Sequence, residues 1–202
     1  AIPRASSQSQ SKMAAQRPEQ RGLIGRVVGD RYGVRGVIGE GGMGVVYEAE
    51  HTGTGRRVAI KAIHTQIAEK TEMVARFQRE ARAAGSIETP HIVQVFDTGK
   101  DADIGTIYMA MELLRGEDLQ RLLRRLGRLP PELALRLVGQ ACLGLGKAHE
   151  AGVVHRDIKP ANLFIEKRKL MPEEVQAGEH EERTRILDFG VSKMRQNNRQ
   201  RS

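Results

Sequence analysis

A glycine-rich segment is the first part of the chain whose residue types could do chemistry. Residues 39–44 read GEGGMG and are followed by VVYEA, an apolar run typical of a strand. A backbone without Cβ atoms can approach phosphate groups closely. A dinucleotide-binding fingerprint would lead directly into a helix, and a P-loop would continue with Gly-Lys-Ser/Thr. Neither pattern is present, so a phosphate-binding hairpin and a plain flexible turn both stay open.

Lys61 ends a second apolar run at residues 58–60, where a lysine by itself is typical of a strand edge. The predicted helix that follows changes this interpretation. Met73 and Phe77 fall on one side of it, and Glu80 lies within the same apolar stripe. A carboxylate that faces the core needs a partner, because an unpaired buried charge is costly. We therefore expect Glu80 to pair with Lys61.

The strongest pattern is HRDIKPAN at residues 155–162, followed by DFG at residues 188–190. In this order, and with the glycine-rich segment, Lys61 and Glu80, these motifs resemble those of the eukaryotic-like (Hanks-type) protein kinases. The residues within the motifs look most like those of the bacterial serine/threonine branch. The resemblance spans about residues 28–192. It implies an α+β, two-lobed protein-kinase-like fold, with a β-rich N-lobe containing one main helix and an incomplete helical C-lobe.

The resemblance also implies ATP and Mg²⁺ as cofactors and assigns roles to the first motifs. Gly39, Gly41 and Gly44 would cover the phosphates of ATP. Lys61, held by Glu80, would contact the α- and β-phosphates.

The later motifs would carry the transfer step. Asp157 would accept the proton of the substrate hydroxyl, and Lys159, which is typical of serine/threonine enzymes, would neutralise the transferring phosphoryl group. Asn162 and Asp188 would hold Mg²⁺, a hard ion that prefers oxygen ligands. His155 is expected to be a packed structural histidine and not a base.

The adenine is expected in an apolar slot, although apolar residues at such positions are equally typical of a plain core. Val46, Ala59 and Phe164 would sandwich the base, Met111 would close the back of the pocket, and residues 112–114 would form the hinge. The residues assigned to this slot are Ile38, Val46, Ala59, Met111, Glu112, Leu114 and Phe164.

Two features depart from the family pattern. The family continues after DFG through an activation segment, an Ala-Pro-Glu motif and further helices, whereas 14 residues follow Asp188 here. We therefore expect a partial chain that binds ATP weakly and transfers phosphate poorly or not at all. The separation of Asn162 and Asp188 is also about twice the family's usual one. The charged surplus, at about 167–185, is predicted to be a solvent-exposed loop between two short strands.

Two functions stay open at this point. One is an ATP-dependent serine/threonine protein kinase that acts on the hydroxyls of protein substrates. The other is a nucleotide-binding or scaffold remnant of a kinase domain without transferase activity. Phosphate transfer that depends on Asp157 would separate them. A small-molecule phosphotransferase is less well supported, because its catalytic loop would lack the complete HRDxKPxN pattern.

Hydrophobic periodicity predicts the elements that position these residues in the first half of the chain. Strand patterns at 45–50 and 57–63 flank a Thr-Gly-Thr-Gly turn, as in a hairpin. A helix is expected over 66–87, and strands are expected over 92–96 and 107–113. Together with the hinge these elements would form an N-lobe at 27–115.

After Gly116 the period becomes helical. A short amphipathic helix is predicted over 118–125, and a longer one opens at the Pro-Pro pair at 130–131. An apolar stripe that includes Val138 runs along the longer helix, and Cys142 is expected to be buried there. This half would form a partial C-lobe at 116–192.

The net charge of +8 comes from the ends of the chain. Half of it lies in residues 1–26 and half in residues 193–202, so residues 27–192 have no net charge. Both end segments are predicted to be basic tails, and the first is predicted to be disordered. Aromatic residues make up 3% of the chain and Trp is absent. No nucleic-acid partner is therefore expected. The sequence shows no membrane segment, and its single cysteine suits a reducing cytoplasmic setting.

Overall fold

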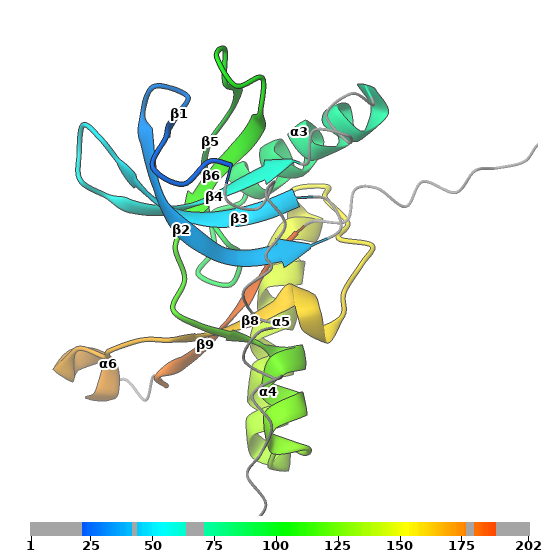
Figure 1. Ribbon diagram of the computed structural model, residues 1–202. Helices are drawn as coiled ribbons and strands as arrows, with labels where there is room; N and C mark the ends of the chain where they lie inside the picture. Colours follow the sequence, from blue (N-terminus) through cyan, green and yellow to red (C-terminus); the bar gives the residue numbers. More distant parts are fainter. Residues whose placement is uncertain (1–21, 42–43, 64–70, 177–179, 189–202) are drawn as a thin grey trace, which may run out of the picture.

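A six-stranded antiparallel sheet forms the first part of the fold (Figure 1). The computed structural model describes residues 22–41, 44–63, 71–176 and 180–188. The strands lie in the order β1-β2-β3-β4-β6-β5. Their bounds are Val27–Val28 (β1), Tyr32–Gly41 (β2), Gly44–His51 (β3), Arg57–Ile63 (β4), Val95–Lys100 (β5) and Ile107–Glu112 (β6).

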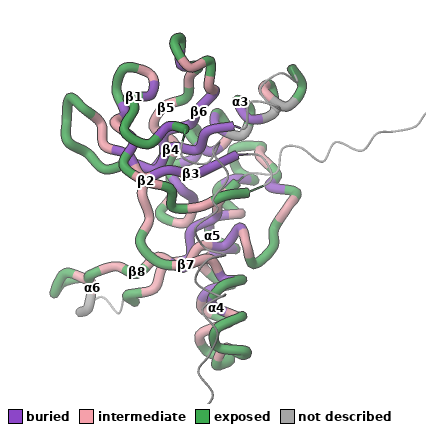
Figure 2. Tube along the Cα trace, in the orientation of Figure 1, coloured by how far each residue is buried: buried purple, intermediate pink, exposed green. Residues whose placement is uncertain are grey.

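The central strands of this sheet supply its core. Buried and half-buried residues alternate along most of β3, whereas β4 is buried at six of its seven positions. Val34, Tyr47, Ile60 and Tyr108 come from four strands and meet in one cluster. Figure 2 shows this core as purple segments along β3 and β4. The predicted hairpin is present as β3 and β4.

One helix, α3 (Thr71–Gly85), packs against this sheet. Its buried Phe77 contacts the cluster that contains Ile63 at the end of β4. The helix predicted over 66–87 is therefore present from Thr71, while residues 64–70 lie outside the described residues.

A three-stranded antiparallel sheet and two longer helices follow. Asp118 caps the first helix, since its Oδ1 accepts the N–H of Arg121 at 2.8 Å. Pro131 begins the second helix, as predicted. The elements are β7 (Gly116–Asp118), α4 (Leu119–Leu126), α5 (Pro131–Glu150), η2 (Pro160–Asn162), β8 (Leu163–Lys167), α6 (Pro172–Gln176) and β9 (Glu182–Ile186).

The buried stripe of α5 is narrower than the sequence predicts. Leu137, Ala141 and Ala148 are buried, whereas Val138 and Cys142 are exposed. The prediction that Cys142 is buried is therefore wrong. Successive helical residues are rotated by about 100°, so Cys142 points away from the stripe that contains Ala141.

The strand predicted over 92–96 is displaced along the chain. β5 begins at Val95, and Ile92 forms an isolated parallel bridge with Ile186 instead. The N–H of Ile186 donates to the carbonyl of His91 at 2.8 Å. The first part of this apolar run therefore joins the two sheets and does not extend β5.

Residues 22–26, at the end of the predicted N-terminal tail, lie among the described residues. Leu23 is buried, and the N–H of Gly25 donates to a carbonyl of β2 at 2.9 Å. The other tail residues, 1–21 and 193–202, lie outside the described residues. Within the described ranges, no helix combines the length and the apolar character that crossing a bilayer requires.

Candidate active site

A pocket of about 140 Å³ is lined by residues from both sheets. Of the eleven described residues that line it, nine are ones for which the sequence predicts contact with ATP or Mg²⁺, and Val93 and Leu187 are the other two. The lining residues are Ile38, Val46, Ala59, Lys61, Val93, Met111, Glu112, Leu114, Phe164, Leu187 and Asp188.

Strand register explains why these side chains share one pocket. Ala59 and Lys61 lie two residues apart on β4 and therefore project from the same face. Ala59 pairs with Met111 of β6, and Lys61 pairs with Val46 of β3. Because paired residues share a face, all four side chains project together. A register shift of one residue would turn a strand's contribution to the opposite face.

Lys61 is a buried cation in the wall of this pocket. Its side chain is 9% exposed, and its Nζ lies 2.6 Å from Oδ1 of Asp188. The carboxylate of Asp188 compensates a charge that would otherwise be costly to bury. The predicted partner, Glu80, belongs to α3, but its side chain lies outside the described residues. The pairing of Lys61 with Glu80 therefore stays a prediction.

Asp188 follows β9 in an uncommon backbone conformation. Its φ of 42° is in the left-handed region, which residues other than glycine seldom adopt. Arg156, directly before Asp157, has a φ of 64°. Such conformations are unfavourable by themselves, and they cluster at functional sites where the surrounding structure holds them. The sequence predicts chemistry for Asp188 itself and for Asp157, which directly follows Arg156.

His155 fixes the loop that precedes η2. Its buried ring donates from Nε2 to the carbonyl of Leu187 at 2.8 Å, and Nδ1 accepts the N–H of Asp157 at 3.3 Å. This pair of bonds assigns the proton to Nε2 of a neutral ring. Burial lowers the pKa of His155 by more than the bond to Leu187 raises it, which favours the neutral form. This arrangement agrees with a structural histidine.

Three polar side chains converge at the start of η2. Nζ of Lys159 lies 2.7 Å from Oδ2 of Asp157. Nδ2 of Asn162 donates to the same Oδ2 at 3.2 Å and to the Asp157 carbonyl at 2.9 Å. The N–H of Leu187 donates to the Asn162 carbonyl at 2.9 Å. The loop that carries Asp157 is therefore bonded to the segment that presents Asp188.

The three glycines predicted to cover phosphates differ in their surroundings. A Cβ on Gly44 would lie 2.0 Å from the carbonyl oxygen of Ala62, so the packing of β3 on β4 requires glycine there. A Cβ on Gly39 would meet its nearest atom at 3.9 Å, and one on Gly41 would meet nothing within 4 Å. A Cβ on Gly39 would therefore make an ordinary van der Waals contact with Val46, whereas open space lies beside Gly41. Residues 42–43 lie outside the described part of the chain.

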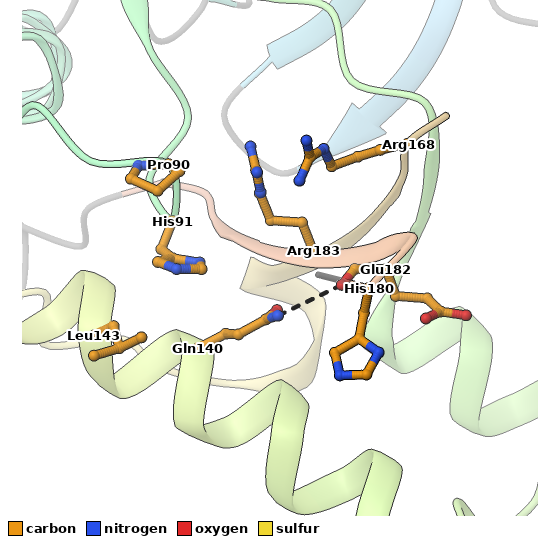
Figure 3. Close-up of a pocket in the computed structure, with 8 residues that line it drawn as sticks. All are labelled: Pro90, His91, Gln140, Leu143, Arg168, His180, Glu182 and Arg183. Carbon is orange, nitrogen blue, oxygen red and sulfur yellow. Dashed lines mark hydrogen bonds between the residues drawn. The ribbon is translucent and has the colours of Figure 1, made fainter. Parts of the chain in front are cut away.

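A second cavity, of about 260 Å³, lies between α5 and β9 (Figure 3). Gln140 crosses between these elements: its Oε1 accepts the N–H of Thr184 at 2.7 Å, and its Nε2 donates to the Glu182 carbonyl at 3.5 Å. Among the described residues, none of those predicted to act on ATP lines this cavity. Its lining residues are Pro90, His91, Gln140, Leu143, Arg168, His180, Glu182 and Arg183.

The charged insert is shorter than the sequence predicts. An exposed loop is expected over about 167–185, but Glu182–Ile186 is β9, and Thr184 and Arg185 are buried there. The prediction of an exposed Arg185 is therefore wrong. Because the segment ERTRI is charged, its sequence does not suggest a strand. In the structure it pairs antiparallel with β8, and this pairing brings Thr184 and Arg185 into the interior.

Three residues at the site escape the sequence patterns. Val93 and Leu187 line the pocket, and Arg185 forms an ion pair with Glu112. Leu187 directly precedes Asp188, and this position next to a motif is a signal that could have found it. Val93 and Arg185 reach the site through the junction of the two sheets, which no local pattern reveals.

Comparison with known proteins gives the same assignment as the motifs. A sequence model of the protein kinase domain matches residues 32–202. The chain is 36% identical over 177 residues to serine/threonine-protein kinase pkn3 of Myxococcus xanthus, covering 88% of this chain and 30% of that protein. It is 41% identical over 171 residues to the probable serine/threonine-protein kinase pknA2 of Bifidobacterium longum, covering 83% of this chain and 21% of that protein.

The architecture also has solved counterparts. The crystal structure of the Mycobacterium tuberculosis PknI kinase domain superposes with a TM-score of 0.65 at 31% identity, covering 83% of this chain and 62% of that chain. The match confirms the predicted two-lobed α+β fold. The chain spans less than a third of the two relatives named above. On the family match, the relatives and the shared fold, this chain belongs to the protein kinase domain family.

Proposed function

We propose that this chain binds ATP with Mg²⁺ in the 140 Å³ pocket and is the nucleotide-binding and catalytic-loop part of a protein serine/threonine kinase, acting in the cytoplasm. One observation carries the proposal. The Lys61–Asp188 pair lines the pocket and is bonded, through the backbone of Leu187, to the loop that holds Asp157. The names of the relatives support protein Ser/Thr hydroxyls as the acceptors.

The adenine would lie in the apolar part of the pocket. Val46 and Ala59 belong to the six-stranded sheet, and Phe164 belongs to the three-stranded sheet. The base would therefore lie between side chains from the two sheets. The backbone after Glu112 leaves β6 at the pocket edge and carries polar groups that can bond the base. Leu114 adds apolar surface there.

The residues predicted to hold Mg²⁺ fit a hard cation. Asp188 offers a carboxylate that is half exposed, at 51%, in the pocket wall. Asn162 donates twice from Nδ2 to Asp157, which leaves Oδ1, an oxygen ligand, as its other polar atom. When bound, the ion would neutralise charge on the phosphates. Lys61, which already contacts Asp188, would add a second positive charge beside them.

Asp157 is the group we assign to the substrate hydroxyl. Its carboxylate is held by Lys159 and Asn162, so it is oriented before any substrate arrives. Lys159 is 52% exposed and lies next to it. In this position its ammonium group would stabilise the negative charge of the transferring phosphoryl group.

The test measures binding and transfer separately. Calorimetry with Mg²⁺ and ATP reports binding, and transfer of radiolabelled γ-phosphate to a generic Ser/Thr protein substrate reports chemistry. Asp157→Asn should lower transfer by about 10²- to 10⁴-fold while ATP binding persists. Asp103→Asn, at an exposed position that does not line the pocket, is the matched control.

Each result of this test has a distinct meaning. Transfer that is unaffected by Asp157→Asn would contradict the role of Asp157. Binding without transfer, both in this chain and in a version extended by a complete kinase C-lobe, would support the nucleotide-binding remnant. Absence of ATP binding would contradict the assignment of the pocket.

A further inference from the structure

Arg185 is a charged residue in a place that charged residues rarely occupy. It lies on β9, three residues before Asp188, and its side chain is 6% exposed. In the β8–β9 ladder it pairs with Phe164, which lines the nucleotide pocket. Arginine is almost never buried to this extent unless its charge is compensated.

The guanidinium of Arg185 has three partners on three segments. One terminal nitrogen donates to the carboxylate of Glu112 and to the carbonyl of Ile92, the latter at 3.1 Å. The other lies 3.4 Å from Oε2 of Glu166. Its Nε is buried and has no hydrogen-bond partner among the described residues. The fork of Arg185 thus joins the end of β6, the run before β5, and β8.

Among the described residues, two ionic links cross from the six-stranded sheet to the segment formed by β9 and Asp188. The first is the pair of Lys61 with Asp188 at 2.6 Å. The second is Arg185 with Glu112. Glu112 and Asp188 both line the nucleotide pocket. The short segment from Arg185 to Asp188 is therefore held to the opposite sheet near both of its ends.

The environment of this network makes it different from a surface ion pair. The carboxylates of Glu112 and Glu166 are only 29% and 17% exposed, so loss of the cation would leave two poorly hydrated negative charges close together. Arg57 and Glu48 form a comparable link between neighbouring strands, but Arg57 is 49% exposed. Exposed pairs of that kind contribute little.

We propose that Arg185 is a positioning residue of the nucleotide pocket: it holds Glu112 at the hinge against β9 and thereby fixes the separation of the hinge backbone and Asp188. The proposal rests on the proposed function, because it explains how the two walls of that ATP site keep their spacing. Arg185 itself does not line the pocket. It acts through Glu112 and through the strand that leads to Asp188.

The experiment compares Arg185→Met with Arg57→Met, the exposed matched control, in the full chain. Calorimetry with Mg²⁺ and a non-hydrolysable ATP analogue should show affinity about 10- to 100-fold weaker for Arg185→Met, the range typical of supporting residues around a site. Arg185→Lys keeps the positive charge but lacks the planar guanidinium that reaches several partners at once, so we expect an intermediate loss of affinity. Ile60→Val, a core change away from the pocket lining, controls for reduced stability alone and should leave affinity unchanged.

Two further measurements separate positioning from stability. Adding Glu112→Gln to Arg185→Met should weaken affinity by much less than Glu112→Gln alone does, because both changes break the same link. In the chain without nucleotide, hydrogen exchange at residues 112–114 and 186–188 should rise together in Arg185→Met and stay unchanged in Arg57→Met.

The outcomes decide the proposal in every case. Unchanged affinity in folded Arg185→Met, additive effects with Glu112→Gln, or exchange that rises at only one of the two segments would overturn it. If Arg185→Met does not fold, Arg185→Lys and Glu112→Gln carry the same comparison. If the unmodified chain binds no analogue, the proposed function fails, and the hydrogen-exchange comparison still decides the role of Arg185.

Discussion

The six-stranded sheet and helix α5 bury their apolar residues to very different extents. β4 is buried at six of its seven positions, with Ile60 at 0% exposure. α5, with 20 residues, buries one stripe, while Leu135 and Leu143 are 75% and 63% exposed. One side of the 140 Å³ pocket is thus built on a strand enclosed by neighbours, and the loop that carries Asp157 follows a helix that is packed along one side.

The described residues therefore support the two parts of the site unequally. Lys61 lies in β4, between two hydrogen-bonded neighbours, so its position follows from the sheet core. The loop with Asp157 depends on a few bonds, chiefly His155 to Leu187 and Leu187 to Asn162. We therefore expect ATP binding to be more robust than phosphate transfer.

The largest expected effect is on the core of the sheet. Ile60→Ala should lower the free energy of unfolding by about 2–5 kcal/mol, because it removes buried methyl groups from a fully enclosed site. Leu135→Ala on α5 should change it by less than about 0.5 kcal/mol, as expected for an exposed position. Urea denaturation measures both. Equal losses would show that α5 is as tightly packed as β4 and would break the comparison.

The glycine-rich hairpin gives a second contrast, within the sheet itself. Gly44→Ala should destabilise the fold by about 1–3 kcal/mol, because its Cβ would overlap the carbonyl of Ala62. Gly41→Ala should leave the melting temperature nearly unchanged, since the space beside it is open, but should weaken ATP binding if phosphates occupy that space. Thermal unfolding and calorimetry test the pair. A stable Gly44→Ala variant would show that β3 and β4 can separate at this end.

The buried carboxylate of Asp101 predicts how the stability of the six-stranded sheet and its loops changes at acidic pH. It is buried, which raises its pKa, but the N–H groups of Gly29, Ile104 and Asp103 outweigh this and lower the pKa below 3.8. A lowered carboxyl pKa contributes stability that is fully present above the unfolded value and is lost as pH falls through the folded value. Asp101→Asn should lower the free energy of unfolding by about 1–3 kcal/mol near neutral pH, because the amide would place its own N–H group opposite a backbone N–H donor.

The measurement is the free energy of unfolding of both forms between pH 7 and pH 3. The cost of Asp101→Asn should shrink only below about pH 4, near the 3.8 of an unperturbed carboxyl. A cost that is already constant and small at pH 7 would contradict the assigned role.

The lowered pKa of His155 predicts that the loop at residues 155–162 loses stability at a higher pH than the six-stranded sheet does. Of the changes considered, this one is expected to be the weakest. Its pKa is lowered from 6.5, so the unfolded chain binds protons first, and stability falls as pH drops from about 6.5 toward the folded pKa. Hydrogen exchange between pH 7 and pH 5 should therefore rise at residues 155–162 before it rises in β3 and β4. Simultaneous loss of protection in both regions would show that the loop and the sheet unfold as one unit.

Much of the site could be predicted because its signals are local. Nine predicted residues line one pocket, and Asp157, Lys159 and Asn162 lie together within one short loop. The hairpin and the start of α5 follow from turn residues and from Pro131. The roles of these residues in binding and transfer stay predictions, as do the proposed lobe boundaries.

Contacts between residues far apart in the chain follow from the tertiary structure and not from any local pattern. Lys61 and Asp188, separated by 127 positions, meet because β4 and the end of β9 lie on opposite walls of one pocket. By itself, the segment ERTRI reads as part of a charged loop, yet Arg185 is buried, because pairing with β8 brings it beside Glu112. Local sequence determines residue chemistry and periodicity. Burial and partner choice depend on strand register and on contacts between sheets, which a local pattern does not contain.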